Sequence, residues 1–158
     1  HYITVTYSLT LLKIMGIEFA TISLRTDELV PEQKLWRGVL VNALEDTLIK
    51  QSDRKSSIYK INAHEWIMLS DPNFEDVCYW SGFEPNKVKE KYVSAIERGD
   101  ISFNQRQVAW AKYYKQYVIY KKSKDTDSKK YHRKRLEYLR NTVKDATTAL
   151  FTCIFITA

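Results

Sequence analysis

Four polar side chains that lie close together in the sequence are of the types that bind duplex DNA. They belong to the stretch PNKVKEKY and are Asn86, Lys87, Lys89 and Lys91. An asparagine can form two hydrogen bonds with adenine, and a lysine can donate to guanine or to a phosphate oxygen. Glu84 and Glu90 lie among them and would repel phosphate. An ordinary exposed helix face with i, i+3 and i+4 charge pairs is therefore an equal alternative.

A second concentration of positive charge lies between residues 111 and 144. This segment holds twelve Lys and Arg against three Asp and Glu, whereas the whole chain has a net charge of +6. Tyrosines are interleaved with the cations, as on surfaces that follow a nucleic-acid backbone. Alternatively, the tyrosines pack one face of a long helix while the lysines face solvent. The densest part, KKYHRKR, holds the residues that we expect to contact phosphate: Lys130, Arg133, Lys134 and Arg135.

The sequence offers no recognisable catalytic pattern. Glu45 and Asp46 are neighbours, as are Glu75 and Asp76, and neighbouring residues on a helix point apart. His64 has no second histidine at the spacing of a zinc-binding helix, and we expect it on a helix surface. The sequence holds no glycine-rich phosphate loop and no nucleophile elbow. We therefore expect a binding protein rather than an enzyme, with no cofactor and no metal.

A hinge centred on a glycine would position the first set of polar residues. Residues 73–92 read as two helices joined at Gly82, where a left-handed backbone favours a residue without a Cβ. Val77 lies five residues before the glycine, the small Cys78 four before, and Val88 six after. At these spacings two crossing helices share a core, so the segment predicts a helix-turn-helix. A structural corner with no DNA-binding role remains the alternative.

The expected helix-turn-helix also has suitable helix ends. Asp71 or Asn73 can cap the first helix, Glu84 can cap the second, and Pro85 suits the second helix's first position. If the second helix enters the major groove, its early residues reach the base edges. Phosphate contacts are then expected from Lys91, Arg98 and Arg106.

The remaining segments favour a mainly helical chain with few turns. Only four Gly and three Pro are present. Pro31 suits the start of a helix, and Asn104 can cap another. Residues 52–57 are expected to be a polar loop, followed by a short helix capped by Ser57 or Asn62. The helix after Pro31 has an apolar stripe through Leu35, Trp36, Val39, Leu40, Ala43, Leu44, Thr47 and Leu48.

The two ends of the chain are the only places where we expect β structure. Residues 2–12 and 17–24 alternate in polarity, which predicts strands turning at Met15-Gly16, with a disordered leader as the alternative. The apolar stretch 151–157 could pair with them. The start at His1 leaves open a fragment or a natural start at Met15. No apolar run reaches the roughly 18 residues of a membrane span, and two cysteines without framework spacing suggest a cytoplasmic setting.

Three stretches share a pattern with a known group of proteins. They are LWRGVLVNALEDTL, AHEWIM and NFEDVCYWSGFEPNKVKEKY, within residues 35–92. Their spacing resembles the pattern W…VL..A..D, A..W, F..VC..AG..P..V of small uncharacterised proteins of tailed phages and alphaproteobacterial prophages, although Ser81 replaces an alanine. The hinge itself resembles the helix-turn-helix of phage and bacterial DNA-binding proteins. The resemblance implies a phage-like setting.

The sequence thus predicts a mainly α-helical domain with a helix-turn-helix at 73–92. We expect an N-terminal segment at 1–26, a helical domain at 27–120, and a basic helix with an apolar tail at 121–158. The expected function is regulatory or packaging-associated binding of duplex DNA, with no membrane partner. A protein-interaction module whose Trp and Tyr faces dock a host or virion protein is the alternative, and either could be an oligomer.

Overall fold

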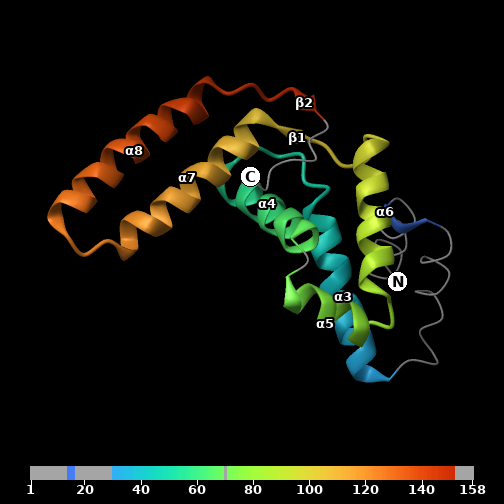
Figure 1. The fold of residues 1–158 in the computed structure, drawn as a ribbon. Helices are drawn as coiled ribbons and strands as arrows, with labels where there is room; N and C mark the ends of the chain where they lie inside the picture. The colour runs from blue at the N-terminus through green and yellow to red at the C-terminus, as the bar shows by residue number, and fades with distance from the viewer. Residues whose placement is uncertain (1–13, 17–29, 70, 152–158) are drawn as a thin grey trace.

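The described part of the chain is mainly helical, as expected. The computed structural model describes residues 14–16, 30–69 and 71–151. In this part it contains six complete helices and one two-stranded sheet. Four helices form the body of the molecule, and two form a long antiparallel hairpin that extends away from it (Figure 1). The body helices are α3 (Pro31–Asp46), α4 (Arg54–Met68), α5 (Pro72–Trp80) and α6 (Pro85–Glu97); the hairpin helices are α7 (Gln105–Lys122) and α8 (Thr126–Asp145).

Helix starts follow local capping rules. Pro31 is the first residue of α3, as predicted. Asn104 caps α7: its side chain accepts from the Gln107 amide at 2.7 Å, and the Gln107 side chain accepts from the Asn104 amide at 3.0 Å. At α8, the Asp125 carboxylate accepts from the Ser128 amide at 3.1 Å. The starts at Pro31 and Asn104 depend on neighbouring residues, which is why the sequence locates them, whereas the Asp125 cap was not predicted.

The start of α4 differs from the prediction. Residues 54–57 are helical rather than part of a loop, and neither Ser57 nor Asn62 is the cap. Asp53 caps the helix instead, because its carboxylate accepts from the Ser56 amide at 3.1 Å. Ser57 lies in the first turn, where its hydroxyl donates to the Asp53 carbonyl at 2.6 Å. The polar residues 54–57, which we expected in a loop, therefore form the first turn of α4.

The small sheet pairs segments from the middle and the end of the described chain. Strand β1 (Phe103–Asn104) runs antiparallel to β2 (Leu150–Phe151). Of the C-terminal segment 151–157, only Phe151 lies within the described residues, and it pairs with Phe103. The strands expected at 2–12 and 17–24 lie outside the described residues. Ile14 and Met15 are helical and buried in the main core, so a hairpin turn at Met15-Gly16 is wrong.

The main core lies between the body helices, but α3 does not bury its whole apolar stripe. Leu40 and Leu44 are fully buried. Leu35 is 62% exposed and Val39 is 38% exposed. The buried face of α3 also includes Arg37, which is not part of the predicted stripe. The predicted stripe is therefore broader than the face that the described chain covers.

The hairpin has a small core of its own. Tyr113, Leu136 and Leu139 are buried there, and other aromatic side chains pack against them. The guanidinium of Arg54, from α4, lies 5.4 Å from the centre of the Tyr113 ring and attaches the hairpin to the body. The domain boundary expected after residue 120 falls within α7, which packs along α8. Within the described residues, no helix combines the length and apolar character needed to cross a bilayer.

Candidate nucleic-acid interface

Helices α5 and α6 meet at a tight corner that contains Gly82. The glycine has φ +82°, in the left-handed region. Its amide donates to the Tyr79 carbonyl at 3.0 Å, and the Phe83 amide donates to the Cys78 carbonyl at 2.9 Å. This pair of bonds is the Schellman pattern that ends many helices at a glycine. The predicted core residues Val77, Cys78 and Val88 are all buried.

A left-handed glycine does not by itself indicate a DNA-binding corner. Gly99 also has φ +82°, and it ends α6 with the same bonding pattern. Asp71 caps α5, because its side chain accepts from the Asn73 amide at 2.8 Å. Glu84 precedes α6 without a side-chain cap. The distinctive features of the corner are therefore its packing and the face of α6 that it exposes.

Arg37 on α3 supports this corner, a role that the sequence analysis missed. Its Nε donates to the Ser81 carbonyl at 2.8 Å, and its guanidinium lies 4.9 Å from the centre of the Phe83 ring. Burial lowers the pKa of Arg37. Its spacing in the sequence could have revealed this role, because Arg37 shares a helix face with the buried Val41 and Leu44.

One face of α6 is open to solvent, and it holds three of the four predicted residues. Val88 and Tyr92 are fully buried and anchor the opposite face. Lys89, one turn from Asn86, is half-buried at the edge of the open face. The exposed residues follow one another at i, i+1, i+4 and i+5: Asn86, Lys87, Glu90 and Lys91. With the exposed Glu84 directly before the helix, the corner brings together an amide, two ammonium groups and two carboxylates.

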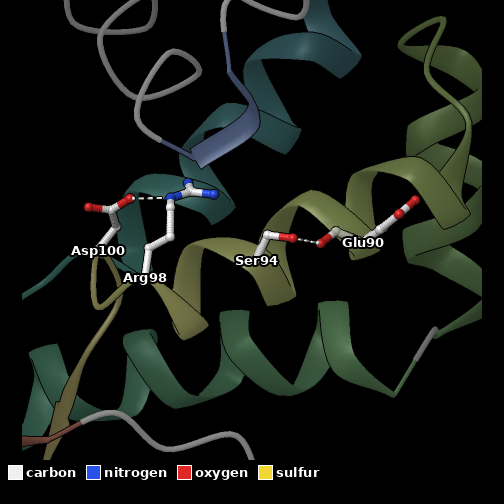
Figure 2. A network of polar contacts seen from close by, with 4 residues as sticks. All are labelled: Glu90, Ser94, Arg98 and Asp100. Carbon is white, nitrogen blue, oxygen red and sulfur yellow. Dashed lines mark hydrogen bonds and ion pairs between the residues drawn. The ribbon is translucent and has the colours of Figure 1, made fainter.

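Two polar contacts lie in the second half of α6 and just beyond it. The Ser94 hydroxyl donates to the backbone carbonyl of Glu90 at 3.0 Å, so this bond does not involve the Glu90 carboxylate (Figure 2). Arg98 pairs with Asp100, with 3.1 Å between Nε and Oδ2. Arg106 donates to the Ala146 carbonyl at 3.5 Å. The phosphate contacts expected of Arg98 and Arg106 would thus compete with contacts inside the chain.

The second predicted set lies on α8, and all four of its cations are exposed: Lys130, Arg133, Lys134 and Arg135. Arg133 donates to the Tyr120 hydroxyl at 3.2 Å, and this bond raises the pKa of Arg133. The guanidinium of Arg135 lies 5.7 Å from the centre of the Tyr138 ring. Internal contacts therefore orient two of the four cations without burying their charge.

Some tyrosines of the hairpin pack between its helices, and others are exposed as a nucleic-acid surface would require. Tyr113 is buried between α7 and α8, and Tyr117 and Tyr120 pack beside it, as the packing alternative predicts. Tyr131 is 67% exposed and Tyr138 is 63% exposed. Only these last two are open enough to act as stacking platforms for a base.

The structure does not bring the two predicted sets together. In Figure 1, α6 lies on one side of the body, and the α7–α8 hairpin projects from the other. The α6 face is small and of mixed charge, whereas α8 is strongly basic. Each helix would therefore contact a different part of a nucleic acid.

His64 is buried, contrary to the expected place on a helix surface. It lies on α4, and its Nδ1 is 2.7 Å from the Tyr92 hydroxyl on α6. Its ring meets Phe103 edge-on, with 4.9 Å between the ring centres. Burial, with a smaller contribution from the charge of Lys60, lowers the pKa of His64 to about 4. The neutral imidazole therefore joins α6 to α4, and it has no access to a substrate.

Lys60 is another buried polar residue that the sequence did not reveal. Its ammonium donates to the carbonyls of Ile49 and Ser102 and lies 4.7 Å from the centre of the Phe103 ring. Burial lowers the pKa of Lys60 to about 8. The residue connects α4 to the chain before β1, so its role is structural.

The described residues contain no metal-binding cluster. No group of three or more His, Cys, Asp or Glu side chains among them is close enough to share an ion. Cys78 is fully buried, and burial raises the pKa of its thiol to about 12. This thiol therefore stays protonated and fills the small-residue position of the corner.

Valine at Gly82 is expected to destabilise the fold by about 1–3 kcal/mol, because a β-branched residue is strained at positive φ. A Cβ there would also lie 2.5 Å from the Gln33 amide nitrogen, a group that can rotate away. Gly99→Val is the matched control, since Gly99 has the same φ and its Cβ would meet nothing within 4 Å. Thermal unfolding measures both variants. An unchanged Tm for Gly82→Val would show that Gly82 is not left-handed.

Comparison of the chain with protein-family models, with curated proteins and with solved structures finds no match in any of the three.

Proposed function

We propose that the protein binds duplex DNA, with α5 and α6 acting as a helix-turn-helix. The observation that carries this proposal is the open face of α6, on which Asn86, Lys87 and Lys91 lie together. The buried Val88 and Tyr92 hold the helix to the body from its other face. A helix held on one side and polar on the other suits the major groove, which admits a single α-helix.

The side chains on this face have complementary roles. Asn86, in the first turn of α6, would pair with adenine, and Lys87 with guanine or a phosphate. The amide groups at the helix N-terminus favour an adjacent phosphate. Glu90 would repel phosphate unless it accepts a hydrogen bond from a cytosine N4 amine, so it favours particular bases over uniform binding.

The α7–α8 hairpin would act as an arm that adds affinity without sequence preference. Its exposed cations neutralise phosphates and release counterions, an effect independent of base sequence. Because α8 projects from the side of the body opposite α6, the arm would contact DNA separately from α6 rather than extend the same surface. Affinity from the arm and base preference from α6 can therefore be separated by mutation.

The expected setting follows from the sequence alone. The resemblance across residues 35–92 suggests a phage-like protein that regulates transcription or assists DNA packaging. Two cysteines without framework spacing favour the reducing cytoplasm. Helix-turn-helix proteins often bind as dimers to paired half-sites, so an oligomer is compatible with this role.

Fluorescence anisotropy with a labelled random duplex tests DNA binding. The affinity should fall steeply between about 50 and 200 mM salt, because each neutralised phosphate contributes a slope of about −0.9 in log affinity against log salt. Lys87→Gln with Lys91→Gln should reduce that slope by nearly 2. Lys34→Gln with Lys50→Gln removes the same charge from exposed sites elsewhere and should leave it almost unchanged. Absence of binding at low salt would refute the proposal.

A protein-interaction module is the second candidate function. Tyr79 is 64% exposed and Trp80 is 48% exposed at the C-terminal end of α5. The Trp80 ring lies 4.6 Å from that of Trp36 on α3. Exposed aromatic side chains that adjoin one another are typical of protein contact surfaces. Such binding would respond weakly to salt, which distinguishes it from DNA binding.

A further inference from the structure

Helix α3 is apolar over a wider arc than the described chain covers. Leu35 and Val39 lie one turn apart on its outer side, and Ala43 and Asp46 continue the same line. Exposed aliphatic side chains aligned along a helix are unusual in a protein that acts alone. The sequence predicts burial for the three apolar members of this line, and the core of the described residues does not fully supply it.

A groove runs beside this line, between α3 and α4. It has a volume of about 380 Å³, and Asn73 on α5 is one of its lining residues. Val39 and Ala43 line it from α3, and Tyr59 and Ala63 line it from α4. The two alanines leave space where the helices meet, and the larger side chains form its walls. The groove is therefore apolar along most of its length.

Asp46 introduces a negative charge at the edge of the groove. The ion pairs among the described residues are Arg98–Asp100 and Lys115–Glu65, and neither involves Asp46. Partial burial raises the pKa of the Asp46 carboxyl. A half-buried carboxylate without a cation is costly, so a partner that supplies one would gain affinity. The neighbouring helix α5 carries Glu75 and Asp76 and no basic residue.

We propose that this groove binds an amphipathic helix of another protein, one with aliphatic residues at i and i+4 followed by a lysine or arginine. Its aliphatic side chains would occupy the space over Ala43 and Ala63 and cover Leu35. Its cation would pair with Asp46. Helix-in-groove recognition uses this combination of spaced apolar anchors and a charge at one end. The inference does not depend on DNA binding, because the groove shares no residue with the exposed face of α6.

Two synthetic peptides of about five helical turns provide the probes. One has leucines at i and i+4 with a lysine one turn beyond them on the same face, and the second has a glutamate in place of that lysine. The lysine peptide, labelled with fluorescein, should bind saturably, and the glutamate peptide at least tenfold more weakly. The chain is basic overall, so non-specific attraction would produce the opposite order.

Three variants locate the binding site. Asp46→Lys should weaken the lysine peptide at least tenfold and strengthen the glutamate peptide. Ala63→Leu should fill the groove and weaken both, with thermal unfolding used to verify that each variant folds. Asp76→Lys makes the same charge change at an exposed site outside the groove lining, and should have little effect.

The remaining outcomes contradict the inference. The lysine peptide could fail to bind saturably. Asp46→Lys and Asp76→Lys could change its affinity equally, or Asp46→Lys and Ala63→Leu could leave its affinity unchanged. Sedimentation of the protein alone provides a further test. A dimer that Ala63→Leu dissociates would show that a second copy of the chain, rather than a different protein, occupies the groove.

Discussion

Glutamine substitution of the four exposed cations on α8 is expected to weaken binding to random duplex DNA about a thousandfold at low salt. The four are Lys130, Arg133, Lys134 and Arg135. If each neutralises one phosphate, the salt slope should also fall by between 3 and 4, at about 0.9 for each contact. The fold should survive, because the hairpin core is formed by other residues, Tyr113, Leu136 and Leu139. Anisotropy across a salt series measures both quantities.

The control for this prediction makes the same change in net charge at exposed sites outside α6 and the hairpin. It combines Lys34→Glu, Lys50→Gln and Lys55→Gln, which together remove four units of positive charge. This variant should lose little affinity and keep its salt slope. If both variants lose the same affinity, overall charge rather than the α8 surface determines binding, and the proposed arm is wrong.

Acid should destabilise the folded protein through His64, by about 3 kcal/mol between pH 6.5 and 4. The pKa of His64 is about 4 in the folded chain, against an ordinary value of 6.5. Below pH 6.5 the unfolded chain therefore binds a proton that the folded chain excludes. Stability is complete above pH 6.5 and falls as pH decreases toward 4. Urea unfolding at a series of pH values measures the loss.

His64→Gln serves as the comparison, since glutamine does not titrate. Carboxylates such as Asp53, whose pKa is lowered by the Ser56 amide, contribute acid loss in both proteins. The difference between the two pH profiles therefore isolates the histidine. Parallel profiles between pH 4 and 6.5 would mean that His64 is solvated and that it does not join α4 to α6.

Stability should also depend on pH in the alkaline range. The pKa of Lys60 is about 8 in the folded chain, against an ordinary 10.5, so stability should rise with pH over that interval. Burial raises the pKa of Tyr92, so stability should fall above pH 10 as the unfolded tyrosine ionises. The two contributions oppose each other where their intervals meet.

Features that depend on neighbouring residues are the ones that the sequence predicts well. Helix starts at Pro31 and Asn104, and the cap at Asp71, follow from short-range hydrogen bonding and proline geometry. The burial of Val77 and Val88 follows from helical spacing around the glycine. Helical class, and the residues that form the α5–α6 corner, could therefore be inferred without coordinates.

Features that depend on distant partners could not be predicted in this way. His64 is buried because Tyr92 and Phe103, both far away in sequence, surround it. Arg37 is buried because the turn at Ser81 offers a carbonyl to its guanidinium. Leu35 is exposed because no described element packs over it. In each case, tertiary packing overrides what polarity alone suggests.

The candidate site likewise has features that the sequence predicts and features that only the fold determines. The sequence identifies the polar residues of α6 but cannot show that Lys89 is half-buried while Asn86 and Lys87 are exposed, because that depends on which face the body buries. It also cannot show that α8 projects from the opposite side of the molecule from α6. The groove between α3 and α4 arises from two helices that only the fold brings together.

A photoreactive benzoylphenylalanine in place of Asn86 tests most directly whether α6 enters a DNA groove. The matched control places the same side chain at Asn62, another exposed helical asparagine, on α4. After irradiation with duplex DNA, residue 86 is predicted to crosslink to bases and residue 62 is not. Equal crosslinking from both positions, or none from residue 86 while the protein is bound to the duplex, would contradict a DNA-reading role for α6.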